Sequence, residues 1–270
     1  MKFWALKICL VCFASSFALA EDIVYSKDET ITGYKYYYEQ DKVTINNGVK
    51  ITYNSSADNR GYFTNNGIIA KGEGNSVFSN TANATFINNG TMTIGQFNNR
   101  GTAYFYGDAT AMCAYGCNGF GNRGSGTFYI IGATLMGDME HDDIYNWKGE
   151  ATIKATNTLN FGICDLANSA KCGAKMGQLN GNFTNKGTSS AINVNIANMV
   201  YGTHYTIITG TISGIDTIGF LGANLDEVTT HYDIAKGEVW IEKKSTQPDK
   251  PDPNPDPDKP NPDNPTPPTA

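Results

Sequence analysis

The chain has 270 residues, of which only 17% are charged, and its formal net charge is −6. It carries no basic patch, which excludes a nucleic-acid partner held by phosphate contacts, because such binding needs clustered lysine and arginine. All ten prolines fall between Pro248 and Pro268, so a proline-free body precedes a distinct C-terminal segment.

The first twenty residues, MKFWALKICLVCFASSFALA, predict a signal peptide at residues 1–20. A lysine near the start, an apolar core, and the small residues Ala18 and Ala20 are what a signal peptidase accepts. The alternative is a membrane anchor, but Lys7 interrupts the apolar stretch, which is short for a span of about 20 residues. We therefore expect export to the periplasm, the cell surface or the medium.

A short phrase that ends in asparagine and glycine recurs along residues 21–190. The copies are INNG at 45–48, FTNNG at 63–67, FINNG at 86–90, FNNRG at 97–101, FGNRG at 120–124, YNWKG at 145–149 and FTNKG at 183–187. Most spacings lie near 22 residues, and one is halved. We expect turns at Asn47, Gly48, Asn66, Gly67, Asn89, Gly90, Asn99, Gly101, Asn122, Gly124, Gly149, Asn185 and Gly187.

Alternating polar and apolar residues follow these glycines, which is typical of half-buried strands. After Gly90, for example, Met92 and Ile94 fall on one face. Asn-Gly also favours antiparallel hairpins, which remain the alternative. The regular recurrence favours an all-β fold, a parallel β-solenoid in which each repeat forms one coil, phenylalanines stack inside, and the turns align along one corner with laddered asparagines.

Four cysteines remain in the mature chain, in two close pairs. Cys113 and Cys117 are separated by three residues, and Cys164 and Cys172 by seven. In an oxidising compartment these pairs predict two short-loop disulfides. A four-cysteine zinc site is the alternative, although the spacings differ from the usual zinc pairs. The long interval from Gly149 to Gly187 also predicts an inserted loop around the second pair.

The sequence contains no convincing catalytic motif, and we expect neither enzymatic activity nor a cofactor. Residues 136–143, MGDMEHDD, hold the densest group of carboxylates and a histidine, which are possible ligands of a divalent cation. A solvated loop is the favoured interpretation of this segment, so we assign no metal site. The candidate ligands are Asp138, Glu140, His141, Asp142 and Asp143.

Tyrosine provides the other candidate for function. Tyr104, Tyr106 and Tyr129 lie at expected outward strand positions, where they would offer both apolar area and a hydroxyl to a glycan or protein. The alternative is that they were selected only for strand propensity. The cluster YKYYYEQ at 34–40 would either cover the first coil or form a binding surface.

Towards the C-terminus the repeat disappears. Residues 191–244 lose the Asn-Gly phrase and gain larger aliphatic residues, which predicts a cap over the last coil, because an uncovered strand edge invites aggregation. Residues 245–270 alternate proline with aspartate, asparagine and lysine, which predicts a disordered, extended linker.

Together these features resemble the passenger domain of a bacterial autotransporter (type V secretion). The resemblance rests on the Asn-Gly coils behind a signal peptide and on YGTHYTIITGTISG at 201–214. It implies a C-terminal cap that assists folding, a Gram-negative outer-membrane setting, and a translocator β-barrel after the linker, which this sequence lacks. Short-loop disulfides also suit passage through a narrow pore.

The resemblance implies a role in adhesion or another surface interaction, with an unknown host-cell or matrix glycan or protein as partner. The alternatives are a β-helical polysaccharide-cleaving enzyme and a toxin-like passenger. A lyase would need acidic and basic residues that converge on one strand face, whereas the expected strands present mainly threonine, asparagine and tyrosine. The adhesin function therefore rests on family analogy.

Overall fold

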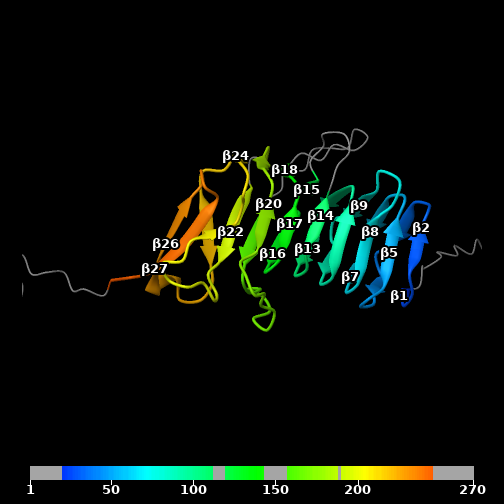
Figure 1. Ribbon diagram of the computed structural model, residues 1–270, viewed down its shortest axis with the longest axis horizontal. Helices are drawn as coiled ribbons and strands as arrows, with labels where there is room; N and C mark the ends of the chain where they lie inside the picture. Colours follow the sequence, from blue (N-terminus) through cyan, green and yellow to red (C-terminus); the bar gives the residue numbers. More distant parts are fainter. Residues whose placement is uncertain (1–19, 112–118, 143–156, 188–189, 246–270) are drawn as a thin grey trace, which may run out of the picture.

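The computed structural model describes residues 20–111, 119–142, 157–187 and 190–245. These residues form an elongated stack of short strands, with the N-terminal end of the described chain at one end of the long axis and the C-terminal end at the other (Figure 1). Three parallel sheets run along the stack, and every third strand returns to the same sheet. The predicted parallel β-solenoid is therefore confirmed.

We call the sheets A, B and C, and we call three consecutive strands, one from each sheet, a rung. Sheet A contains β1 (Asp22–Tyr25), β4 (Lys42–Ile45), β7 (Tyr62–Asn65), β10 (Thr85–Asn88), β13 (Thr102–Phe105), β16 (Thr127–Ile131), β19 (Thr158–Gly162), β22 (Ala191–Asn195) and β25 (Ile218–Leu221). Sheet B contains β2 (Glu29–Ile31), β5 (Lys50–Tyr53), β8 (Ile68–Lys71), β11 (Thr91–Ile94), β14 (Ala109–Ala111), β17 (Thr134–Met136) and β20 (Gln178–Asn180). Sheet C contains β3 (Lys35–Tyr37), β6 (Ala57–Asn59), β9 (Val77–Asn80), β12 (Gln96–Asn99), β15 (Phe120–Arg123), β18 (Met139–Asp142), β21 (Phe183–Asn185) and β24 (Ile212–Ser213).

The core is a set of columns that run along the solenoid, because alternate residues of each strand face inward and the same position recurs in the next rung. In sheet C, Phe78, Phe97 and Phe120 are in register and fully buried. The rings of Phe78 and Phe97 are parallel, with centroids 5.8 Å apart. Phe86 of sheet A packs against Phe97 at 5.0 Å. Phenylalanines from two sheets thus fill the centre of the coil.

Buried asparagines form a second column, which we call the asparagine ladder: Asn59, Asn80, Asn99 and Asn122 of sheet C. Each side-chain amide donates to the side-chain oxygen of the next, at 2.8, 2.8 and 3.0 Å. The amide of Asn99 also donates to the backbone carbonyl of Thr127, at 3.1 Å. Polar side chains can occupy this interior column because their hydrogen bonds are satisfied there.

The repeated turns lie at two corners, not along one corner as the sequence had predicted. FTNNG and FINNG connect sheet A to sheet B, whereas FNNRG, FGNRG and FTNKG follow strands of sheet C. A second, shorter ladder therefore exists in sheet A, where Asn65 donates to Asn88 at 2.7 Å. The halved spacing between Gly90 and Gly101 is a step from one corner to the other.

Glycine is needed at these corners for two different reasons. Gly124 adopts a positive φ of 58°, which glycine tolerates because it has no Cβ. Gly90 does not, but a Cβ there would collide with the carbonyl oxygen of Gly67 in the preceding rung. Close stacking of the corner backbones is therefore the reason for glycine at position 90.

Parallel stacking continues beyond residue 190, since β22 and β25 still belong to sheet A. The antiparallel cap sheet is formed by β23 (Tyr205–Thr206), β27 (Glu238–Lys243) and β26 (Val228–Asp233), and the short helix η1 (Leu225–Glu227) precedes β26. The predicted cap thus combines final solenoid strands with this sheet. The predicted signal peptide, apart from Ala20, and nearly all of the predicted linker lie outside the described residues.

Candidate functional site

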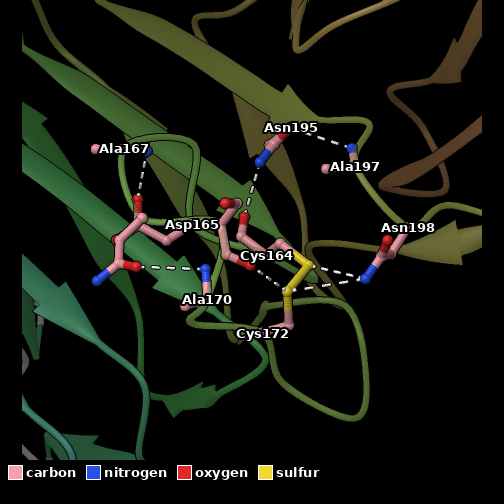
Figure 2. Close-up of a disulfide and its surroundings, with 10 residues drawn as sticks. Cys164, Asp165, Ala167, Ala170, Cys172, Asn195, Ala197 and Asn198 are labelled. Carbon is pink, nitrogen blue, oxygen red and sulfur yellow. Dashed lines mark hydrogen bonds between the residues drawn. A yellow bond between two sulfur atoms is a disulfide. The ribbon is translucent and has the colours of Figure 1, made fainter.

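The most elaborate surface feature is the disulfide loop, residues 163–177, which connects β19 to β20. It contains the disulfide Cys164–Cys172, which confirms the second predicted pair. Its base is held by Asn195, the last residue of β22, and by Asn198. The Asn195 side-chain amide donates to the backbone carbonyl of Cys164 at 2.8 Å, and the Asn198 amide contacts the Cys164 sulfur at 3.0 Å (Figure 2). The predicted pair Cys113 and Cys117 lies outside the described residues.

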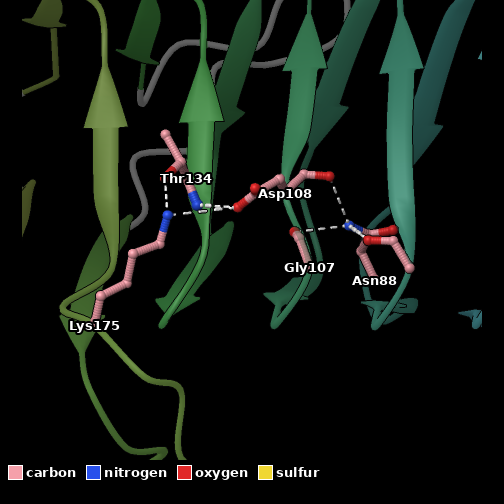
Figure 3. Close-up of polar contacts among 6 residues, drawn as sticks. Asn88, Gly107, Asp108, Thr134 and Lys175 are labelled. Carbon is pink, nitrogen blue, oxygen red and sulfur yellow. Dashed lines mark hydrogen bonds and ion pairs between the residues drawn. The ribbon is translucent and has the colours of Figure 1, made fainter.

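The disulfide loop extends back along the corner between sheets A and B, across earlier rungs. Lys175 donates to the hydroxyl of Thr134 at 2.6 Å and lies 3.9 Å from Asp108 (Figure 3). Lys171 reaches still further and donates to the side-chain oxygen of Asn89, at 3.3 Å. The loop therefore joins residues more than 80 positions apart in the chain.

A pair of glycines lets the loop lie directly on the solenoid. Gly132, at the end of β16, has a φ of 66°, and a Cβ there would lie 2.5 Å from the Cα of Gly173. The backbone amide of Gly173 donates to the carbonyl of Ile163 at 2.8 Å. Any larger residue at position 132 or 173 would push the loop away from the corner.

Beside the loop lies the tyrosine face, Tyr104, Tyr106 and Tyr129, on the outer side of sheet A. The rings of Tyr104 and Tyr129 are parallel with centroids 4.6 Å apart, and Tyr106 is parallel to Tyr104 at 6.1 Å. The hydroxyl of Tyr106 donates to the buried carboxylate of Asp165 at 2.5 Å. The three tyrosines predicted as a surface are thus brought together, half-buried, and one is tied to the disulfide loop.

The strand positions around Tyr104 and Tyr129 carry no charged side chain. Two outward rows cross the middle strands of sheet A: one consists of Tyr62, Thr85, Thr102, Thr127 and Thr158, and the other of Thr64, Ile87, Tyr104, Tyr129 and Asn160. Burial raises the pKa of the Tyr104 and Tyr129 hydroxyls above the usual value, so they stay protonated at physiological pH. They can therefore both donate and accept hydrogen bonds.

A pocket of about 270 Å³ opens between the loop and the corner. Tyr106, Ile131 and Asn89 line the solenoid side, and Ala170, Lys171, Cys172 and Gly173 line the loop side. The Lys171 ammonium lies 4.1 Å from the centroid of the Tyr106 ring, a cation–π distance. The pocket therefore combines one aromatic ring, the aliphatic side chains of Ile131 and Ala170, and one cationic group.

The acidic segment at 136–143 is not the solvated loop expected from the sequence, because residues 139–142 form strand β18 of sheet C, in which Glu140 and His141 are buried. His141 is fully buried and continues the asparagine ladder, with Nε2 3.3 Å from the amide of Asn122. Glu140 pairs with Lys186 at 2.5 Å, and Asp138 accepts from the backbone amide of Asn182 at 2.8 Å.

Within the described part of the chain, no group of three or more histidine, cysteine, aspartate and glutamate side chains could hold a metal ion. Asp142 does not form a group with the other candidate ligands that could hold a metal ion, and Asp143 lies outside the described residues.

The N-terminal tyrosine cluster divides between the inside and the outside of the first rung. Tyr37 faces inward, and its hydroxyl lies 2.7 Å from that of Tyr53. Tyr34, Tyr36 and Tyr38 are exposed, with the Tyr34 and Tyr36 rings 4.7 Å apart. The same segment therefore supplies both core and surface aromatics.

Several residues of the site were not singled out from the sequence. Asp165 and Lys171 join the tyrosine face only because the disulfide loop folds back. The ladder positions Asn65 and Asn88 were also missed, since the neighbouring Asn66 and Asn89 were chosen as turn residues. The spacing Phe-x-Asn could have identified them, because residues two apart face the same side of a strand.

The predicted turn residue Gly149 lies outside the described residues. The turn prediction was wrong for Asn99, Asn122 and Asn185, which lie within strands β12, β15 and β21, because the side chains of Asn99 and Asn122 face the interior as part of the asparagine ladder. The remaining predicted turn residues lie between strands. Across the described part of the chain, we find no helix with the length and apolar character needed to cross a membrane. Comparison of the chain with protein-family models, curated proteins and solved structures finds no match.

Proposed function

We propose that the chain is an exported bacterial surface protein, an autotransporter-type passenger that acts in adhesion or another surface interaction. The observation that carries the proposal is the tyrosine face, a set of parallel rings on an uncharged strand surface beside a disulfide-closed loop. Tyrosines held rigidly lose little conformational entropy when they bind, which suits them to a binding surface.

Two further features support this function. The disulfide Cys164–Cys172 fits an oxidising compartment, as expected for an exported chain. The solenoid is elongated and its rungs repeat, so the outward side of sheet A forms a continuous surface along the molecule (Figure 1). The proposal includes no catalytic step.

The direct test is binding of the purified, oxidised mature chain to cultured host cells and to immobilised matrix components. Binding should saturate with concentration, and the double substitution Tyr104→Ala with Tyr129→Ala should weaken it at least tenfold, because aromatic residues dominate binding surfaces. The matched control is Thr93→Ala with Thr110→Ala, on adjacent strands of sheet B. Thermal unfolding should show that each variant remains folded.

Two results would contradict the proposal. The first is the absence of saturable binding to any cell or matrix surface. The second is equal binding by the tyrosine and threonine double variants, which would remove the tyrosine face from the function.

A further inference from the structure

Lys171 is an ammonium group placed in a pocket without an acidic partner. Among the described residues, no carboxylate lies within ion-pair distance of its Nζ, which instead contacts Asn89 and the Tyr106 ring. Lys175 on the same loop does have such a partner, Asp108 at 3.9 Å. The pocket of Lys171 therefore favours an anionic guest.

The carboxylate of Asp165, on the same loop, is already engaged. Its Oδ2 accepts from the Tyr106 hydroxyl at 2.5 Å, and its Oδ1 accepts from the backbone amide of Ala167 at 2.8 Å. Because Asp165 is buried, these bonds hold Tyr106 in a defined orientation at the edge of the pocket. Asp165 thus acts as a positioning residue for the aromatic wall.

The size and lining of the pocket suit one small ring of a guest. Its volume is about 270 Å³, below the usual range for sites that enclose a drug-sized ligand, about 300–1,000 Å³. Ile131, Ala170 and Tyr106 provide apolar contact, and the amide of Asn89 and the Lys171 ammonium provide polar contact. One sugar ring with a single carboxylate combines these properties.

The tyrosine face extends the pocket into a longer track. Tyr104 lies beside Tyr106, and Tyr129 stacks on Tyr104 in the next rung. Because the rings of Tyr104 and Tyr129 stack on one another, their edges and hydroxyls are what a ligand can contact. Such a surface suits a partner with many hydroxyls, as a saccharide chain has.

We propose that the pocket between the disulfide loop and the solenoid corner binds the carboxylate-bearing sugar of an acidic glycan. Lys171 pairs with the carboxylate, Tyr106 packs against the sugar ring, and neighbouring sugars lie along Tyr104 and Tyr129. The inference rests on the proposed adhesion function and specifies its ligand class.

The test is isothermal titration calorimetry of the oxidised mature chain with four probes: sialyllactose, a glucuronate-containing disaccharide, lactose and sulfated lactose. A carboxylated probe should bind at least tenfold more tightly than lactose, because a charge-assisted hydrogen bond is stronger than a neutral one. Its affinity should also fall with added salt. If sulfated lactose binds as tightly, or if no probe binds, the carboxylate assignment is overturned.

Lys171→Gln should reduce the affinity for the carboxylated sugar about tenfold or more, and Lys171→Arg should restore part of it. Lys175→Gln is the matched control, since it removes the same charge from the same loop outside the pocket. Equal losses in the Gln variants at 171 and 175 would refute a specific role for Lys171. Thermal unfolding of all three variants checks their fold.

The proposed function and this inference can fail separately. If Lys171→Gln retains full cell binding while the Tyr104 and Tyr129 double variant loses it, adhesion stands and the acidic-sugar pocket is refuted. If neither the wild-type chain nor any variant binds cells or glycans, both are refuted.

Discussion

Buried asparagine is the residue that distinguishes this solenoid interior from an ordinary apolar core. The Asn65 amide donates to Asn88 and to the carbonyl of Thr91, and its oxygen accepts from the amide of Gly67. Each bond is modest by itself, but an unpaired polar group in this position costs about 1–3 kcal/mol. Stacked asparagines therefore favour the correct register between rungs more than they add net stability.

Asn65→Ala should lower the free energy of unfolding by about 1–3 kcal/mol, since it leaves the Asn88 side-chain oxygen without this donor. Asn66→Ala, one residue along the same turn, should cost less, because its bond to Asn89 is exposed to solvent. Urea titration followed by circular dichroism measures both variants. Equal losses of unfolding free energy in the two variants would show that burial of the Asn65 hydrogen bonds does not determine their contribution to stability.

His141 takes a ladder position with a titratable side chain. Burial lowers its pKa to about 3, and the opposing effect of Asn157 is smaller. In the unfolded chain its pKa is near 6.5, so between these values the unfolded state binds more protons than the folded state. Stability from this group is complete above pH 6.5 and is lost progressively as the pH falls towards 3.

Lowering the pH from 7.5 to 5 should therefore cost the folded state about 2 kcal/mol through His141. His141→Asn should remove this loss, because asparagine is the residue of the preceding ladder positions and does not titrate. The measurement is urea unfolding of both proteins at several pH values. A His141→Asn variant with the same pH dependence as the wild type would contradict this assignment.

At the scale of elements, the disulfide loop both connects β19 to β20 and forms part of the surface beside the tyrosine face. The loop is short, so closing it contributes about 2 kcal/mol by restricting the unfolded chain. Its larger consequence is local, because Asp165 and Lys171 lie within the closed ring and both contact Tyr106. Loss of the disulfide would release both side chains from the tyrosine face.

The double variant Cys164→Ser with Cys172→Ser should show faster amide hydrogen exchange in residues 163–177. Protection of the backbone amides in the central strands β13 and β16 should persist, because their hydrogen bonds to neighbouring strands do not depend on the loop. The same variant should lower the free energy of unfolding by about 2 kcal/mol. Unchanged exchange in the loop would mean that other contacts, such as those of Asn195 and Lys175, are sufficient to order it.

The whole molecule is stabilised by contacts between neighbouring rungs, as in other repeat architectures. Such a stack has two terminal rungs whose edges need protection. At the C-terminal end, the antiparallel sheet of β23, β26 and β27 buries Val228, Val239 and Ile241. These three residues belong to the same buried cluster as Ile192 and Val194 of β22, so the sheet extends the core at this end of the stack.

Truncation after Leu221 should therefore produce a protein that associates or aggregates, which light scattering would measure. Deletion of residues 246–270 alone should change neither the melting temperature nor the mass measured by light scattering. A proline- and aspartate-rich segment has no large apolar side chains to add to the core. If the chain truncated at Leu221 remained monomeric with an unchanged melting temperature, the cap would have no protective role.

The sequence by itself determined the solenoid. Phe-x-Asn-x-Gly repeated at intervals near 22 residues, alternation after each glycine, and the absence of proline before Pro248 indicate stacked parallel strands. These signals are local and periodic, so one copy of the repeat predicts the next. Pairing of Cys164 with Cys172 was predictable for the same reason, since the two lie close in the chain.

Only the tertiary structure decided which turns share a corner and what the disulfide loop contacts. The same phrase serves both corners, so its letters cannot distinguish them. The contact between Lys171 and Asn89 links residues 82 positions apart through a loop that folds backward. Such long-range contacts depend on how rungs of unequal length stack, and no local pattern in the chain encodes them.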